Sequence, residues 1–159
     1  MHPNADVLNR LFTALNQHDH KTMAECYDEN ATFTDIAFEL DGRKRIHAMW
    51  NMICEGDIRT SFEIVEVDER RAVAKVVDDY TFRPKGRKVH NVIQSRFRFE
   101  NGKIVDQQDA CDPREWASMA LGGVGGFLAG RLPFLRRAKA RKTLAAFIGK
   151  HPEYKRQSH

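Results

Sequence analysis

The chain has 159 residues, of which 42% are hydrophobic and 30% charged, as in an ordinary globular domain with a sizeable core. No stretch approaches the ~20 apolar residues that span a bilayer, and the first ten residues lack the basic start and apolar run of a secretory signal. Three widely spaced cysteines, Cys26, Cys54 and Cys111, form no CxxC pair and predict a reducing compartment. We therefore expect a cytoplasmic protein.

The net charge of +4 is unevenly distributed along the chain. Residues 131–159 hold nine Lys and Arg against one acidic residue, Glu153, whereas the rest of the chain is mildly acidic. A basic tail can bind nucleic acid or an anionic membrane, or it can be the solvated face of a docked terminal helix. We favour the docked helix, expect no nucleic-acid partner and keep membrane contact by the tail as a weaker alternative.

The N-terminal part predicts three helices and one strand. A first helix has an apolar face at helical spacing, formed by Leu8, Leu11, Phe12 and Leu15, with Asn4 as its N-cap. A second short helix, capped by Asp19, buries Met23, Cys26 and Tyr27, and the segment Ala31–Asp35 alternates like a strand. A third helix carries Ile46, Met49, Trp50 and Ile53 and ends at Gly56.

The pattern then changes to four long segments rich in β-branched and aromatic residues: Thr60–Val67, Ala72–Phe82, Lys88–Phe99 and Lys103–Cys111. Short polar breaks between them predict hairpins, and therefore an antiparallel meander. Helices followed by such a meander indicate an α+β fold, with three helices on one curved antiparallel sheet.

The C-terminal part predicts two more helices around a glycine-rich segment. One helix begins at Pro113 and runs through Met119, and a basic helix begins at Pro133. Between them, GGVGGFLAG holds five glycines in nine residues and is a poor helix former. The basic helix has an apolar stripe of Ala140, Leu144, Phe147 and Ile148. We predict a domain over 1–121 and a linker with a terminal helix over 122–159, packed on the domain or on a dimer partner.

Three segments together resemble known families. The segment Leu11–Asp35 resembles the opening of the ketosteroid-isomerase and SnoaL-like families, Gly42–Trp50 resembles their G-[KR]-x-x-I helix, and Phe97–Asp112 resembles their FxFxxGKI…DxxD strand pair. Both families belong to the nuclear transport factor 2-like superfamily. The resemblance implies a cone-shaped fold, a pocket inside the cone and a homodimer formed through the sheet. It implies no single activity, because the superfamily holds isomerases, cyclases, dehydratases, epoxide hydrolases and non-enzymatic binders.

Several polar side chains fall on strand faces that are otherwise apolar. They are Asp35, Asp78, Tyr80, Asn91, Ser95 and Asp109. Burial of an unpaired carboxylate is costly, so such groups are paired, solvated in a cavity or protonated. We expect these residues to surround a ligand, with Phe33 and Trp50 as apolar walls of the pocket.

The resemblance implies roles for two of these aspartates. Asp35 falls where ketosteroid isomerases carry the carboxylate that moves a proton, but Leu11 and Ser95 replace the Tyr and Asp of their oxyanion hole. Asp109 falls where SnoaL-type cyclases and limonene-type epoxide hydrolases carry an Asp. The partner His of the cyclases corresponds to Ser95, and the Arg of the hydrolases corresponds to Val76. Each known chemistry therefore keeps a carboxylate and lacks a partner.

Structural roles compete with these catalytic ones. Asp35 can cap the loop that follows it, and Asp109 can pair with Arg96 or Arg98. Asp112 can cap the helix that begins at Pro113. For Asp78 and Asp79, cross-strand pairing with Arg or Lys is the corresponding alternative.

The predicted function is binding of a hydrophobic small molecule in a carboxylate-bearing pocket. If the protein is catalytic, it is a cofactor-independent isomerase, cyclase, dehydratase or epoxide hydrolase, with Asp35 and Asp109 as acid and base. Asn91, Ser95 and Tyr80 orient a ligand oxygen in this hypothesis. We expect no metal, because His18 and His20 lack a second ligand pair. The alternative is a non-enzymatic module that binds a ligand or a protein.

Overall fold

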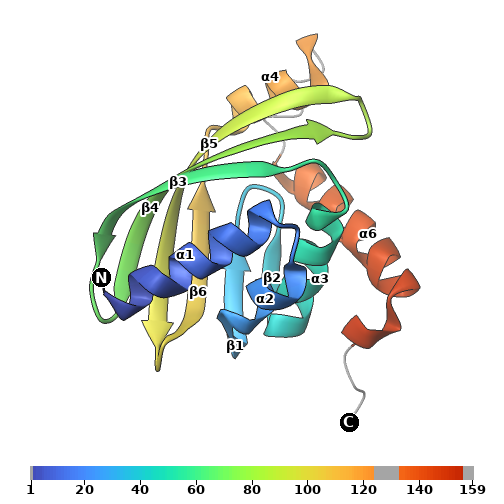
Figure 1. Cartoon of the computed structure of the whole chain (residues 1–159). Helices are drawn as coiled ribbons and strands as arrows, with labels where there is room; N and C mark the ends of the chain where they lie inside the picture. The colour runs from blue at the N-terminus through green and yellow to red at the C-terminus, as the bar shows by residue number, and fades with distance from the viewer. Residues whose placement is uncertain (1, 124–132, 156–159) are drawn as a thin grey trace.

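The computed structural model describes residues 2–123 and 133–155, except for the side chains of 133–135. One curved six-stranded sheet has the order β2-β1-β6-β5-β4-β3, and α1, α2 and α3 lie on its concave side (Figure 1). The strands are β1 (Tyr27–Thr34), β2 (Glu39–Asp41), β3 (Arg59–Val67), β4 (Arg71–Phe82), β5 (Arg87–Glu100) and β6 (Lys103–Ala110). The helices are α1 (Pro3–Asn16), α2 (His20–Glu25), α3 (Arg43–Cys54), α4 (Pro113–Leu121), α6 (Pro133–Lys150) and the short 3-10 helix η1 (Pro152–Tyr154). The predicted α+β fold is confirmed.

Strands β3 to β6 form the predicted antiparallel meander. The turn between β5 and β6 follows from Asn101 and Gly102, whose φ angles of 51° and 75° lie in the left-handed region. Strand β1 pairs with β6 in parallel, and the short β2 pairs antiparallel with β1. A parallel pair needs a crossover, and α3 with the meander provides it.

Local capping agrees with the sequence at α2 and differs at α1. The Asp19 carboxylate accepts a hydrogen bond from the backbone N–H of Thr22 at 3.1 Å, as an N-cap does. Asn4 is not the N-cap of α1, which is His2. The Asn4 side chain instead donates to the backbone oxygens of Asp68 and Glu69, at 2.9 and 3.0 Å. This residue therefore ties α1 to the turn between β3 and β4, because a buried amide must find partners.

The basic helix α6 packs on the main body of the molecule beside α3 (Figure 1). Its predicted apolar stripe is buried at Leu144, Phe147 and Ile148, and burial of each such side chain contributes about 1.5–3 kcal/mol. Asn51 of α3 also donates to the Tyr154 hydroxyl at 2.9 Å. In the described residues the terminal helix therefore packs on its own chain. Most of the predicted linker, residues 124–132, lies outside the described residues.

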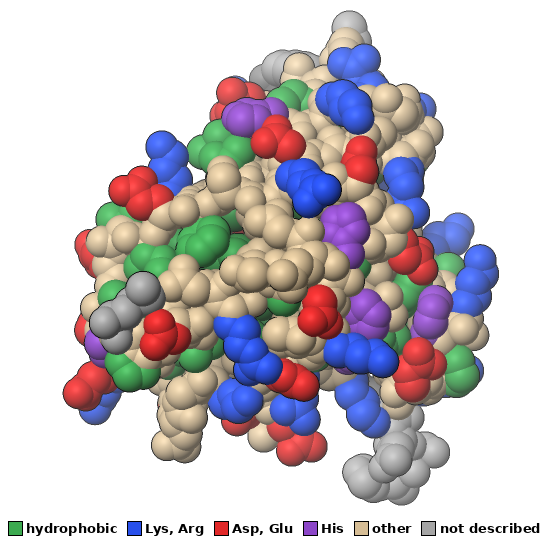
Figure 2. Space-filling view, in the orientation of Figure 1, with side chains coloured by type: hydrophobic (Ala, Val, Ile, Leu, Met, Phe, Trp, Pro, Cys, Tyr) green, Lys and Arg blue, Asp and Glu red, His purple; other side chains and the backbone are tan. Residues whose placement is uncertain are grey.

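Charges of both signs are mixed over the face shown in Figure 2, where Lys and Arg alternate with Asp and Glu. The surface in this view therefore has no broad basic area of the kind that nucleic acid binding requires. Separately, no helix of the described residues is long and apolar enough to cross a membrane.

Candidate functional site

Strands β4 and β5 alternate between buried and exposed residues and so define an inner face of the sheet. Along β5, Val89, Ile93 and Phe97 are buried while their chain neighbours are exposed, and Ser95 lies buried among them. On β4, Asp78 is half-buried and stands opposite Asn91 of β5. The alternation of the strands thus carries these polar side chains toward the helices.

Asp109 of β6 is held on this inner face by an amide. The Gln107 side chain donates to the two carboxylate oxygens of Asp109 at 3.2 and 3.3 Å. Within the described residues no Lys, Arg or His forms a salt bridge with Asp109, so the predicted pairing with Arg96 or Arg98 is absent. Burial raises the pKa of Asp109 to about 7, although Ser95 and Gln107 act to lower it.

A buried hydrogen-bond chain supports Gln107. The Tyr27 hydroxyl donates to Gln107 Oε1 at 2.5 Å, and Trp50 Nε1 donates to the Tyr27 hydroxyl oxygen at 3.1 Å. Phe33 packs edge-on against Trp50, with ring centroids 5.8 Å apart. Trp50 and Phe33 are buried in the core at the inner face, and their predicted role as walls of a ligand pocket stays a prediction. Trp50 also holds the Asp109 carboxylate in place through Tyr27 and Gln107.

Gln107 lies two residues before Asp109 and therefore on the same strand face, but the residues predicted for the site did not include it. Arg98 pairs with Asp106, but Phe99 pairs with Ile104, so Val105 is an extra residue on this strand. The bulge places Ile104, and not Val105 as simple alternation predicted, among the buried residues of this strand. Gln107 is 1% exposed, and its spacing of two residues from Asp109 is the signal that could have identified it.

Asp35 caps its own loop, as the structural alternative predicted. Its Oδ1 accepts hydrogen bonds from the backbone N–H groups of Ala37 and Phe38 at 2.7 and 2.6 Å. Burial raises the pKa of Asp35, while these two N–H groups and the guanidinium groups of Arg137 and Arg136 lower it. Asp35 is also close enough to Asp109 for its charge to raise the pKa of Asp109. The structure therefore places the two predicted acids within electrostatic range of each other.

Asp78 lacks the predicted partner. Its Oδ1 is buried without a hydrogen bond, and the Oγ1 of Thr60, the residue opposite Asp78 on β3, is likewise unpartnered. Thr60 is nonetheless near enough to lower the pKa of Asp78, which burial raises to about 6. Cross-strand pairing belongs instead to Asp79, whose carboxylate lies 2.6 Å from the ring of His90.

Helix α4 lies across the ends of β4 and β5 (Figure 1). Trp116 Nε1 donates to the Tyr80 hydroxyl oxygen at 2.6 Å, and the Trp116 ring packs edge-on against Phe82. The predicted N-cap of this helix is confirmed, because the Asp112 carboxylate accepts from the backbone N–H of Arg114 at 2.9 Å. Trp116 therefore covers the end of the inner face that carries Tyr80. The sequence patterns did not predict a role for this residue.

Asn91 and Ser95 lie beside the acids of the inner face. Asn91 lies close enough to the Cys111 thiol to lower its pKa, which burial raises to about 11. Ser95 Oγ is buried and has no hydrogen-bond partner of normal geometry, although it affects Asp109. A buried hydroxyl without a partner is uncommon, and it is available to a ligand oxygen.

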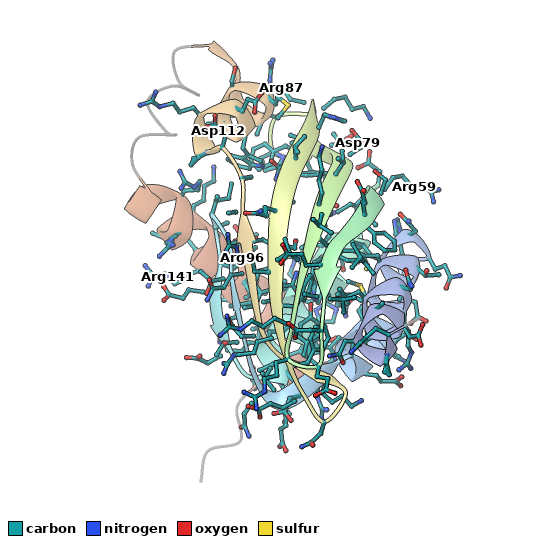
Figure 3. All side chains as sticks on the ribbon, turned by 90° about the vertical axis from the view of Figure 1, so that its left-hand side faces the viewer. Arg59, Asp79, Arg87, Arg96, Asp112 and Arg141 are labelled. Atoms are coloured by element: carbon teal, nitrogen blue, oxygen red, sulfur yellow. The ribbon has the colours of Figure 1, made fainter. Side chains whose placement is uncertain are left out.

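Two hollows in the described residues lie away from Asp35 and Asp109. One of about 300 Å³ lies at the ends of β4 and β5, where Tyr80, Val89 and Met119 form part of its lining. The other, of about 570 Å³, lies against Arg71, Arg96 and other residues of the sheet. Neither is lined by Asp35 or Asp109. In Figure 3, Asp79 and Arg59 lie at one edge of the sheet beside the first hollow.

Comparison with known proteins identifies the family. Residues 8–107, more than half of the chain, match the SnoaL-like domain. The chain belongs to the SnoaL-like domain family. No curated protein matches the sequence.

Solved structures of this SnoaL-like protein's fold share 15–24% sequence identity with it and show the fold alone. A Mycobacterium tuberculosis LEH-like epoxide hydrolase has a TM-score of 0.61 at 15% identity, covering 84% of this chain and 95% of that one. A candidate polyketide cyclase from Silicibacter has a TM-score of 0.66 at 17% identity, covering 74% and 94%. A candidate isomerase from Bacillus subtilis has 0.64 at 18%, covering 77% and 96%.

The described residues hold no group of three His, Cys, Asp or Glu side chains that suits one metal ion. The inner face instead gathers three acids, a tyrosine, an asparagine and a serine. Such a set can bind oxygen atoms and move protons.

Proposed function

We propose that the inside of this SnoaL-like cone binds an apolar small molecule and that Asp109 transfers a proton to or from it without a cofactor. The observation that carries this proposal is a partly buried carboxylate that accepts from an amide and forms no salt bridge with any cation of the described residues. Burial raises the pKa of Asp109 to about 7. A group with such a pKa is populated in both forms near neutral pH, which is what general acid–base catalysis needs.

The other polar side chains have supporting roles in this proposal. Ser95 Oγ and the Tyr80 hydroxyl orient an oxygen of the ligand, while Asn91 and Asp78 complete the polar side of the pocket. Asp35 is the second carboxylate, and its charge raises the pKa of Asp109. In the simplest reaction, Asp109 removes a proton from a carbon next to a carbonyl and returns it elsewhere, so that the substrate is isomerised.

Epoxide hydrolysis is a related use of the same carboxylate. One structural neighbour is an LEH-like epoxide hydrolase, and Asp109 and Asp78 together supply two acids for a water attack. The described inner face has Val76 where the resemblance expects the arginine of that chemistry. Proton transfer at carbon therefore remains the leading proposal, because it needs only the groups that are present.

The test is proton exchange at carbon. Purified protein is incubated in D₂O with a panel of apolar cyclic ketones, and NMR follows loss of the protons next to the carbonyl. We expect exchange with at least one ketone, and Asp109→Asn lowers its rate by about 100-fold or more. Asp106→Asn is the matched control, because Asp106 on the same strand bonds Thr32 and should leave the rate unchanged. Equal rates in the two variants would refute the role of Asp109.

The alternative function is ligand binding without catalysis. It is supported by Asp35, which caps its own turn as a structural residue does. Binding of the ketones without exchange would favour this alternative. Homodimer formation through the sheet stays a prediction, and sedimentation of the purified protein tests it.

A further inference from the structure

The start of α6 brings two arginines to the loop that Asp35 caps. Arg136 Nε donates to the backbone oxygen of Ile36 at 2.9 Å, and Arg137 Nη1 donates to Glu39 Oε2 at 3.3 Å. Both contacts join residues about one hundred positions apart in the chain. The basic helix therefore contributes directly to the end of the sheet where β1 and β2 meet.

Both guanidinium groups also contain a buried nitrogen that lacks a hydrogen-bond acceptor. Arg136 Nη1 and Arg137 Nε are buried and have no hydrogen-bond partner. Arg137 is paired with Glu39, but no carboxylate of the described residues forms a salt bridge with Arg136. The segment 124–132 contains no Asp or Glu that could supply one. A partly buried cation without a salt bridge is costly, so Arg136 can accept an anionic partner.

The position of Arg136 links it to the candidate site. Its charge lowers the pKa of both Asp35 and Cys111. Asp35 in turn acts on Asp109, so the guanidinium and the proposed acid belong to one electrostatic neighbourhood. Arg136 and Arg137 have two acids near them, Glu39 and Asp35, so this place has one net positive charge only when Asp35, whose pKa burial raises, holds a proton. That state matches a ligand group with a single negative charge.

We propose that Arg136 binds the carboxylate of an otherwise apolar substrate, whose remaining part reaches toward Asp109. This inference rests on the proposed function and adds the substrate class. A planar guanidinium with a free nitrogen suits a carboxylate, which it can hold through parallel hydrogen bonds. The terminal helix is then a part of the binding site, and it selects acids over neutral molecules of the same shape.

The experiment uses a pair of probes of the same shape that differ in charge: 2-naphthoate and 2-naphthamide. Their dissociation constants at pH 7 are measured by calorimetry for the full chain and for Arg136→Gln. We expect the unaltered protein to bind the acid at least ten times more tightly than the amide. Arg136→Gln should remove that preference while its affinity for the amide stays unchanged.

Arg141→Gln is the matched control, because Arg141 is an exposed residue of the same helix (Figure 3), and it should keep the full preference. Arg136→Lys retains the charge without the planar fork and should keep part of it; this variant also decides the matter if Arg136→Gln does not fold. An unaltered protein that binds acid and amide equally, or a preference that survives Arg136→Gln, would overturn the inference while leaving the pocket intact. Failure to bind either probe would count against the pocket itself, and therefore against both proposals.

Discussion

Asp78 and Asp79 are neighbours in the chain, yet they occupy two different chemical environments. Asp78 faces inward, has a buried oxygen without a partner, and has a pKa raised to about 6. Asp79 faces outward, is exposed, and lies 2.6 Å from the ring of His90. Because both residues are aspartates, the face of the strand, and not the residue type, decides which acid can serve as a proton donor at neutral pH.

The same contrast separates Asp109 from Asp57. Burial raises the pKa of Asp109 to about 7, whereas hydrogen bonds from Thr81 lower the pKa of the exposed Asp57 to about 2. One acid therefore destabilises the folded state when it is charged, and the other stabilises it. Substitutions of Asp109 and Asp57 should therefore change the pH dependence of stability in opposite directions.

The largest effect is expected for Asp109→Asn. Between pH 4 and 7 the folded protein keeps a proton on Asp109 that the unfolded chain has lost, so wild-type stability falls as pH rises. The variant lacks this dependence, and its free energy of unfolding relative to wild type should therefore increase over that range and level off above pH 7. Because one pKa unit corresponds to about 1.4 kcal/mol, we expect an increase of at least that size, measured by urea unfolding.

Asp106→Asn, on the same strand and bonded to Thr32, is the control for this series and should not reproduce the rise. If the stability difference between Asp109→Asn and wild type were the same at pH 4 and at pH 7, Asp109 would not be a buried titrating group.

A smaller effect is expected for Gln107→Leu. Loss of the amide removes two hydrogen bonds to Asp109 and leaves the Tyr27 hydroxyl without its acceptor, which costs about 1–3 kcal/mol of stability. Since Gln107 lowers the pKa of Asp109, that pKa should move above about 7. The pH range over which stability falls should then extend to higher pH.

The neighbouring Gln108 is exposed and bonds Asp106, so Gln108→Leu is the control for this prediction. It should change neither the stability nor the pH range. Equal behaviour of the two leucine variants would show that Gln107 fills space without holding the carboxylate.

The smallest effect, and the opposite sign, is expected for Asp57→Asn. Asp57 accepts hydrogen bonds from the backbone N–H and the hydroxyl of Thr81 at 2.7 and 2.6 Å. Its lowered pKa means that the stabilisation is complete above pH 4 and is lost as pH falls toward 2. The variant should therefore melt at a lower temperature than wild type at pH 7, and the gap should close in acid. A gap that widened in acid would contradict the account.

Much of this arrangement could be predicted from the sequence. The alternation along β4 and β5 placed Asp78, Asn91 and Ser95 on the inner face, because strand geometry has a fixed period of two. The helical spacing of Leu144 and Phe147 likewise predicted the docked face of α6. Local periodicity was sufficient for these elements.

The remaining site residues depend on events that periodicity does not record. A bulge at Val105 turned Ile104 inward in its place, which a simple alternation could not find. Tyr27 was expected in a helix, but it begins β1 and places its hydroxyl beside Gln107. Arg136 reaches the loop after β1 only because α6 folds back over the domain. Such long-range contacts are set by tertiary packing.

The proposed chemistry requires that Asp109 titrates near neutral pH inside the cone. Carbon-13 NMR of the labelled aspartate carboxyl groups, with Asp109→Asn to assign the resonance, measures this directly. The account predicts a titration midpoint near pH 7 for Asp109 and one near pH 2 for Asp57. A midpoint near pH 4 for Asp109 would show a solvated carboxylate and would remove the basis of the proposed chemistry.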